Sequence, residues 1–235
     1  MGFWKTDLGT MKPRKLWLAV GILTVLVFVG ETAGLLPGPR FMRGTVVFLS
    51  MFSSPVILLM FLFPVSIILA VYFLVRAVKR GPEERRNALS KLAASLAFPL
   101  LLFLVLHASY HVRWSAFARA GRNGEPIIAA VLSYYADKGC YPENLHDLVP
   151  AYLEAIPSTG LMAYPDFRYR KGAENIKATY HLQDREDLMV TWELMIDCPR
   201  GLSFDKFVYW PEENYPETIP SYRVDRIGKW AYLWE

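Results

Sequence analysis

Three long apolar stretches dominate the first half of the chain, over residues 16–36, 45–78 and 92–108. A hydrocarbon core about 30 Å thick is crossed by roughly 20 helical residues, so each stretch is long enough for a membrane-spanning helix. Within the second stretch, Ser54 and Pro55 are typical of an N-cap and a first helical residue. We therefore expect membrane spans at about 16–36, 53–78 and 90–110, in a membrane domain of residues 1–112.

Positive charges are distributed unevenly among the segments that flank these spans. Ten Lys and Arg residues lie in the N-terminal tail and in the loop between the second and third spans, whereas the first loop holds two, Arg40 and Arg43. Loops rich in Lys and Arg stay in the cytoplasm, so the N-terminus is predicted to be cytoplasmic. Three crossings then place the chain after about residue 110 outside the cytoplasm. The predicted location is a bacterial inner membrane, with a C-terminal domain in the periplasm.

The second half of the chain, 113–235, has the pattern of an α+β domain. A cluster of Gly, Asn and Pro residues at 121–126 predicts a break or kink in the helix that leaves the third span. An amphipathic helix is expected directly afterwards, and Gly139 is a typical helix stop. Its apolar residues recur at helical spacing: Ile127, Ile128, Val131, Leu132, Tyr134 and Tyr135.

The period of the pattern changes to two further along the chain, which predicts strands. A short helix is expected from Pro142 to about Val149. Residues 167–170 and 178–183 are predicted to form a hairpin around Gly172 and Asn175, and further strands are expected at 189–197, 204–210 and 229–234. Antiparallel sheets commonly bury one face and leave the other in water. The fold class is therefore three membrane helices plus an amphipathic helix packed on a small antiparallel sheet.

The run GCYPENLHDLVPAYLEAIPSTG, at residues 139–160, links the predicted helix to the predicted sheet. A long helix, this run and a sheet together resemble type IV pilins, and most of all the major pseudopilin of type II secretion. The resemblance covers roughly residues 100–185 and implies a pilin-like domain. The residues that match are Gly139, Tyr141, Pro142, Leu145, Leu148, Pro150, Tyr152, Leu153, Ile156 and Pro157.

The chain also departs from the pilin pattern. The Gly-Phe processing site, with a Glu five residues into the mature chain, does not precede the third span, and the pseudopilin's calcium loop has no match. No metal ligands are therefore carried over. A pilin-like domain on an unrelated multi-span membrane base is the interpretation that we adopt.

Cys140 and Cys198 are the two cysteines of the chain, and both lie in the half predicted to be periplasmic. The bacterial periplasm is oxidising, so we predict a disulfide between them, worth roughly 4 kcal/mol on a chain-entropy estimate. The alternative is two buried or partner-facing thiols. His107 and His111 stand four residues apart on a helix, a spacing that suits one metal ion, although an interfacial polar pair is the simpler interpretation.

Charge and motifs exclude several functions. Residues 1–112 hold 12 Lys and Arg against 4 Asp and Glu, whereas residues 113–235 hold 14 against 18. The basic character thus belongs to the membrane half, and no nucleic-acid surface is expected. No nucleophile motif or phosphate-binding loop is present in the sequence, so neither an enzyme nor a cofactor is predicted.

Aromatic residues are abundant near the C-terminus, more so than one small core is expected to bury. We therefore predict an exposed recognition face for a protein partner in the cell envelope, drawn from Tyr209, Trp210, Tyr215, Trp230 and Trp234. The predicted function is protein binding or scaffolding at the membrane, linked to type II secretion or pilus-type machinery. The alternative is a membrane-anchored sensor or accessory subunit that binds a small ligand, peptide or glycan.

Overall fold

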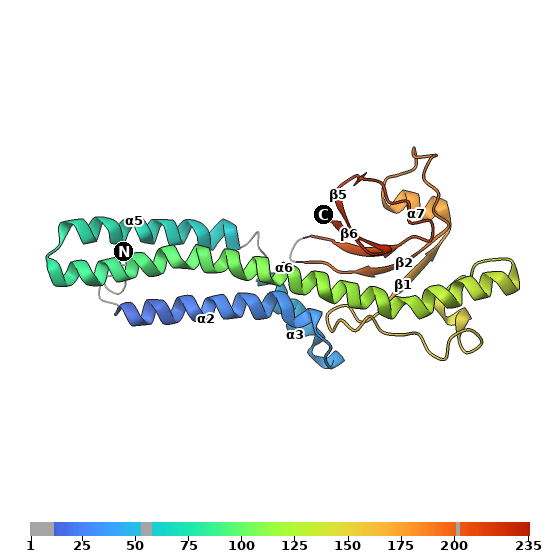
Figure 1. Ribbon diagram of the computed structural model, residues 1–235, viewed down its shortest axis with the longest axis horizontal. Helices are drawn as coiled ribbons and strands as arrows, with labels where there is room; N and C mark the ends of the chain where they lie inside the picture. The colour runs from blue at the N-terminus through green and yellow to red at the C-terminus, as the bar shows by residue number, and fades with distance from the viewer. Residues whose placement is uncertain (1–11, 53–57, 201–202) are drawn as a thin grey trace. The chain divides into compact units, whose positions relative to one another are not determined.

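The computed structural model describes residues 12–52, 58–200 and 203–235 (Figure 1). The chain divides into two compact units. We call the first the membrane unit, which comprises Met1–Thr32 and Phe52–Tyr110, and the second the C-terminal unit, which comprises Ala33–Met51 and His111–Glu235. The predicted start of the second span at Ser54 and Pro55 lies outside the described residues.

Among its described residues, the membrane unit contains three α-helices. They are α2 (Pro13–Thr32), α5 (Phe63–Lys79), which follows the π-helical turn η3 (Leu58–Leu62), and the first part of α6 (Pro82–Lys138). Each contains a segment long and apolar enough to cross a membrane, as the sequence predicted. A small cluster of Val20, Val27, Phe98 and Leu102 is buried within the unit, and most of its other large apolar side chains face outward.

The segment after α2 belongs to the C-terminal unit, although the sequence assigned it to the membrane domain. It contains η1 (Ala33–Leu35), η2 (Arg40–Met42) and α3 (Arg43–Phe52). The amide of Ala163 donates to the carbonyl of Gly34 at 3.0 Å, and Arg43 Nε donates to the carbonyl of Ala163 at 3.1 Å. A Cβ on Gly34 would lie 2.8 Å from Ala163 Cβ, so this contact requires glycine.

Helix α6 is continuous through Gly121–Pro126, so of the predicted break or kink the break is wrong, and the kink stays a prediction. The two glycines instead make room for Trp230, since a Cβ on Gly121 would lie 3.1 Å from its ring and a Cβ on Gly124 would lie 2.8 Å from it. The residues that signalled a break therefore form a notch for one aromatic side chain. The predicted stop is confirmed: α6 ends at Lys138, and Gly139 has a φ of 69°.

The sheet of the C-terminal unit has six antiparallel strands in the order β1-β2-β3-β6-β5-β4. The strands are β1 (Arg168–Lys171), β2 (Trp192–Asp197), β3 (Lys206–Tyr209), β4 (Thr218–Ile219), β5 (Tyr222–Ile227) and β6 (Trp230–Trp234). Strands β2, β3 and β6 lie within the predicted ranges. Strands β4 and β5 were not predicted, and β5 turns into β6 through Gly228 and Lys229.

The hairpin predicted over 167–183 is wrong. Strand β1 pairs with β2, and the helix α7 (Ala173–Thr179) follows it. Ile176 and Tyr180, four residues apart, are both fully buried. A helix places both side chains on the same face, so their burial stabilises a helix over the predicted turn. The signal was present in the sequence as an i, i+4 pair, but Gly172 and Asn175 were interpreted as a turn.

Apolar clusters cover both faces of the sheet, so the expected water-exposed face is also wrong. On one side Trp192, Leu194 and Ile196 of β2 pack with α6 residues such as Phe117 and Val131. On the other side the cluster combines residues of α7, the chain after it, strands β2, β3, β4 and β6, and the residue after β3: Ile176, Tyr180, Leu182, Leu188, Val190, Met195, Val208, Trp210, Ile219, Ala231 and Leu233.

Candidate functional site

The run at 139–160 is held against the helix and the sheet by its apolar residues. Leu145 and Leu148 are buried in η4 (Leu145–Leu148), the short helix predicted from Pro142 to Val149. Asn144 caps this turn: its Oδ1 accepts from the amide of His146 at 2.9 Å, while Asp147 Oδ2 accepts from the amide of Asn144 at 2.9 Å. Of the remaining residues that resemble the pilin run, Tyr141, Tyr152, Leu153 and Ile156 are partly buried against the core.

The tyrosines of this run fix its position through ring contacts. The Tyr141 ring stacks on Tyr135 with centroids 4.3 Å apart and lies 6.2 Å from Trp192. The Tyr152 ring lies 5.3 Å from Tyr134. Aromatic pairs at these separations add to the stability gained from burial, so the run forms an ordered surface.

A cleft of about 430 Å³ opens beside this run, and we call it the His146 cleft. The hydroxyl of Tyr169 is buried there without a hydrogen-bond partner among the described residues. Burial is the main reason that the pKa of Tyr169 is raised, so the hydroxyl keeps its proton. An unsatisfied buried donor is costly, and a ligand in the cleft would remove that cost. The cleft is lined by Asn144, Leu145, His146, Ile156, Pro157, Ser158, Asp166, Phe167 and Tyr169.

A second cleft of about 430 Å³ shares Asp166 with the first, and we call it the Arg43 cleft. Two cations, Arg43 and Arg168, and two carboxylates, Asp166 and Asp197, line it. Tyr164 supports its wall, because its hydroxyl donates to the carbonyl of Pro199 at 2.7 Å. The cleft therefore offers charges of both signs within one concave surface.

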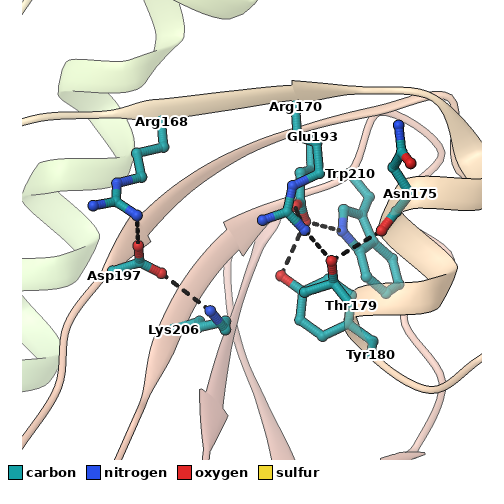
Figure 2. A network of polar contacts seen from close by, with 9 residues as sticks. All are labelled: Arg168, Arg170, Asn175, Thr179, Tyr180, Glu193, Asp197, Lys206 and Trp210. Atoms are coloured by element: carbon teal, nitrogen blue, oxygen red, sulfur yellow. Dashed lines mark hydrogen bonds and ion pairs between the residues drawn. The ribbon is translucent and has the colours of Figure 1, made fainter.

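Ion pairs connect the edge strand β1 to its neighbours (Figure 2). Arg168 Nη1 lies 2.5 Å from Asp197 Oδ2, and Lys206 Nζ lies 3.1 Å from Asp197 Oδ1. Arg170 lies directly opposite Glu193 in the register, with Nη1 3.2 Å from Oε1. Opposite charges on facing strands stabilise a sheet, so these pairs hold β1 in position at the clefts.

Glu193 is a fully buried carboxylate within this network. Its Oε2 accepts from the hydroxyl of Tyr180 at 2.9 Å and from Trp210 Nε1 at 3.3 Å. The contact of its Oε1 with Arg170 is a charge interaction that lacks hydrogen-bond geometry. Burial raises the pKa of Glu193, and the nearby Arg170 opposes that rise. Glu193 of β2 therefore joins Arg170 of β1, Tyr180 just after α7 and Trp210 just after β3.

A second buried polar cluster surrounds Arg113 of α6. Its Nε donates to the hydroxyl of Tyr232 at 2.8 Å, and its guanidinium lies 5.4 Å from the centre of the Phe117 ring. The hydroxyl of Tyr232 donates in turn to Asp205 Oδ2 at 3.0 Å. This arrangement gives the buried guanidinium a hydrogen-bond acceptor and an aromatic neighbour, and it ties α6 to β6.

The predicted disulfide between Cys140 and Cys198 is not supported, because both thiols are free. Cys140 is exposed just after α6, whereas Cys198 is fully buried, with its Sγ 3.7 Å from the hydroxyl of Tyr232. Burial raises the pKa of Cys198 to about 12. In the folded protein Cys198 is thus an unreactive core thiol.

His107 and His111 are both exposed on α6. Among the residues that the structure describes, no group of three or more His, Cys, Asp or Glu side chains is placed to hold a metal ion. Whether the histidine pair alone binds one stays an open prediction.

The prediction of an exposed aromatic face is wrong for three of its five residues. Tyr209, Trp210 and Trp230 are buried, and the exposed fractions are 6%, 0% and 2%. Tyr215 and Trp234 are partly buried and bonded within the fold: the Tyr215 hydroxyl donates to the carbonyl of Lys229 at 2.9 Å, and Trp234 Nε1 donates to Asp225 at 2.8 Å. The aromatic excess is explained by two cores, one on each side of the sheet.

Sequence reasoning named Leu145, Ile156 and Pro157 of the His146 cleft as part of the pilin-like run, but it missed the other residues that line the two clefts. Arg43, Asp166 and Tyr169 come from segments far apart in the chain, and no local motif marks them. Comparison with known proteins found no matching family model, no matching curated protein and no matching solved structure.

Proposed function

We propose that this is a three-span membrane protein that binds a segment of a partner protein in the His146 and Arg43 clefts of its C-terminal unit, without catalysis. The observation that carries this proposal is the pair of clefts that share Asp166, one with an unpartnered tyrosine hydroxyl and one with charges of both signs. Tyrosine and arginine are the residue types that contribute most at protein interfaces. Mixed charges suit a polypeptide surface better than a single small anion.

The chain segments that make up the C-terminal unit support the proposed membrane topology. The segment Ala33–Met51 follows the first span, the domain from His111 follows the third, and both belong to one compact unit. They must therefore lie on the same side of the membrane, which requires an even number of crossings between them. Two apolar helices, α5 and the start of α6, supply those crossings. The distribution of Lys and Arg favours the periplasm of a bacterial inner membrane as that side.

Cysteine labelling tests this location. A membrane-impermeant maleimide added to intact spheroplasts is expected to label Cys140, which is exposed, and to spare Cys198, which is buried. Cys140→Ser should abolish the label. In that background, Asn87→Cys, in the loop predicted to be cytoplasmic, should react only after lysis. Labelling of Asn87→Cys but not of Cys140 in intact cells would reverse the proposed orientation.

The partner class that we propose is an envelope protein of secretion or pilus-type machinery. This rests on the resemblance of residues 139–160 to the pseudopilin run, whose residues form one wall of the His146 cleft. A membrane-anchored sensor or accessory subunit that binds a small ligand, peptide or glycan is the alternative proposal, and the resemblance of residues 139–160 to the pseudopilin run does not favour it.

Photo-crosslinking in cells tests the clefts directly. A photoreactive amino acid at His146 or Asp166 is expected to give a discrete protein adduct. The same amino acid at Lys229, an exposed residue of the β5–β6 turn, should give none. Equal adducts at all three positions, or adducts at Lys229 alone, would refute cleft binding.

Tyr169→Phe separates binding from folding at the same site. The substitution removes a hydroxyl that has no partner within the described chain, so the free energy of unfolding should stay the same or increase. A bound partner that uses the hydroxyl should lose about three- to tenfold in affinity, the usual net worth of one hydrogen bond. Unchanged affinity for the crosslinked partner would remove Tyr169 from the proposed interface.

A further inference from the structure

The two edges of the six-stranded sheet differ in how they are protected against pairing with another chain. At one edge, β4 is two residues long; Pro220 follows it directly, and Pro216 stands two residues before it. Short edge strands and prolines, which lack an N–H donor, hinder the addition of a strand. At the other edge, β1 has four residues and no proline. The sheet is therefore protected at β4 and open at β1.

The register of β1 fixes which of its backbone groups point outward. The amide of Gly172 donates to the carbonyl of Thr191 at 3.0 Å, directly after the last registered pair of β1 and β2. Residues of antiparallel strands alternate between pairs that exchange hydrogen bonds and pairs that do not. Arg170 therefore bonds to β2, whereas the amides and carbonyls of Tyr169 and Lys171 point away from it.

These outward groups are unused within the described part of the chain. Tyr169 and Lys171 each carry one N–H donor and one C=O acceptor. Among the described residues, none of these groups takes part in a hydrogen bond. Both residues are partly exposed, so the edge reaches the protein surface. An extended segment alongside β1 would satisfy donors and acceptors alike, as in other cases of strand addition.

The cations of β1 do not guard this edge. Charged side chains on an edge strand commonly discourage a second strand, but those of β1 are paired within the fold. Arg168 and Arg170 extend toward carboxylates of β2 and lie 2.5 Å and 3.2 Å from them (Figure 2). Lys171 Nζ lies 2.5 Å from Glu143 Oε1. The charge of β1 is therefore balanced before any partner arrives.

The His146 cleft lies at the same edge, since Phe167 and Tyr169 belong to its lining. Tyr169 stands opposite Leu194, a residue of the core shared with α6, so its side chain is on the α6 side of the sheet. Side chains of a strand alternate between the two sides, and every second side chain of an added strand would enter the cleft. Leu145 and Ile156 favour apolar side chains there, and the Tyr169 hydroxyl favours an acceptor.

We infer that the partner segment bound in the His146 cleft is an extended chain that pairs with the outer edge of β1 as an added strand, with apolar residues at alternate positions. This inference rests on the proposed partner binding and specifies its form. A second copy of this chain is a poorer match, because its own β1 has the sequence RYRK and offers no aliphatic side chain at either set of alternate positions.

A comparison of Lys171→Pro with Lys171→Ala tests the backbone pairing. Both variants remove the side chain and its ion pair with Glu143, but only proline removes the outward N–H. An edge strand tolerates proline where that N–H faces solvent. In cells, the photoreactive amino acid at His146 is expected to give at least about threefold less protein adduct in Lys171→Pro than in Lys171→Ala, the effect of one lost hydrogen bond.

The outcomes separate this inference from the proposed function. Absence of an adduct at both His146 and Asp166 in the otherwise unchanged protein would remove the proposed partner binding itself. An adduct of equal yield in Lys171→Pro and Lys171→Ala would leave cleft binding in place and overturn only the added strand. An adduct between two copies of this chain would show pairing with a second copy and overturn the assignment of a partner segment.

The stability of the same variants checks the assigned register without any partner. In a Cys140→Ser background, alkylation of the buried Cys198 in increasing urea reports unfolding of the C-terminal unit. Lys171→Pro should unfold at nearly the same urea concentration as Lys171→Ala. Arg170→Pro should unfold at a lower concentration than Arg170→Ala, because its N–H bonds to β2. An equal penalty for proline at both positions would contradict the outward direction of the Lys171 amide and overturn the inference.

Discussion

The two units of this protein use apolar residues in opposite ways. In the membrane unit, Phe103 and Ile68 are 65% and 66% exposed, and few residues form an internal cluster. In the C-terminal unit, Trp192, Trp210 and Tyr180 are fully buried. The difference follows from the solvent, since lipid accepts an apolar side chain that water rejects. An apolar residue therefore indicates a core in one unit and only a lipid-facing surface in the other.

The largest expected effect is that of Trp230→Ala. Trp230 is 2% exposed, stacks on Phe207 with centroids 4.9 Å apart and fills the notch at Gly121 and Gly124. Removal of such a side chain costs about 3–5 kcal/mol. In a Cys140→Ser background, alkylation of the buried Cys198 in increasing urea measures the unfolding of the C-terminal unit specifically.

Phe103→Ala is the control from the membrane unit. Its ring is already outside the protein interior, so the urea midpoint for Cys198 alkylation should not move. A loss of C-terminal stability as large as that caused by Trp230→Ala would contradict the contrast between the two units.

A smaller effect is expected from Gly124→Ala. The new Cβ would lie 2.8 Å from the Trp230 ring and 3.3 Å from the Phe167 ring, and such overpacking costs about 1–3 kcal/mol. This exceeds the gain in helix propensity of about 1 kcal/mol. Gly21→Ala is the matched change in α2, where a Cβ meets nothing within 4 Å, and it should be neutral or slightly stabilising. Thermal unfolding of both variants measures the difference. An unchanged unfolding temperature for Gly124→Ala would contradict the close contact of Gly124 with the Trp230 ring.

The smallest expected effect concerns the pH dependence that Glu193 gives to the C-terminal unit. Its folded-state pKa is raised by burial, so its protonated form is favoured by folding. The stabilisation is therefore present below the ordinary pKa of a glutamate and is lost as pH rises through the raised value. Glu193→Gln has no such titration. As pH rises through the raised pKa of Glu193, the urea midpoint of the wild type should therefore fall relative to that of the variant.

Glu217→Gln is the control for that measurement, because Glu217 is exposed. Its urea midpoint should follow that of the wild type at every pH. A wild-type protein that gains stability relative to Glu193→Gln as pH rises would contradict the assigned direction of the pKa shift.

The errors in sequence interpretation have a common physical cause. Gly121 and Gly124 signalled a break because glycine weakens a helix locally, but contact with Trp230, about 100 residues away, outweighs that cost. Gly172 and Asn175 signalled a turn, but burial of Ile176 against the sheet stabilises a helix. The C-terminal aromatic residues signalled a surface because one core was assumed, whereas the sheet has a core on each side.

The sequence by itself determined the features that depend on local composition and period: three apolar helices, a helix that stops at Gly139, and strands at β2, β3 and β6. Hydropathy and backbone preference act over a few neighbouring residues, so a linear reading detects them. Tertiary structure alone decided that Ala33–Met51 joins the C-terminal unit, that Cys198 is buried apart from an exposed Cys140, and that two clefts share Asp166. Those outcomes depend on the free energies of contacts between segments far apart in the chain, and a local sequence pattern carries no information about such contacts.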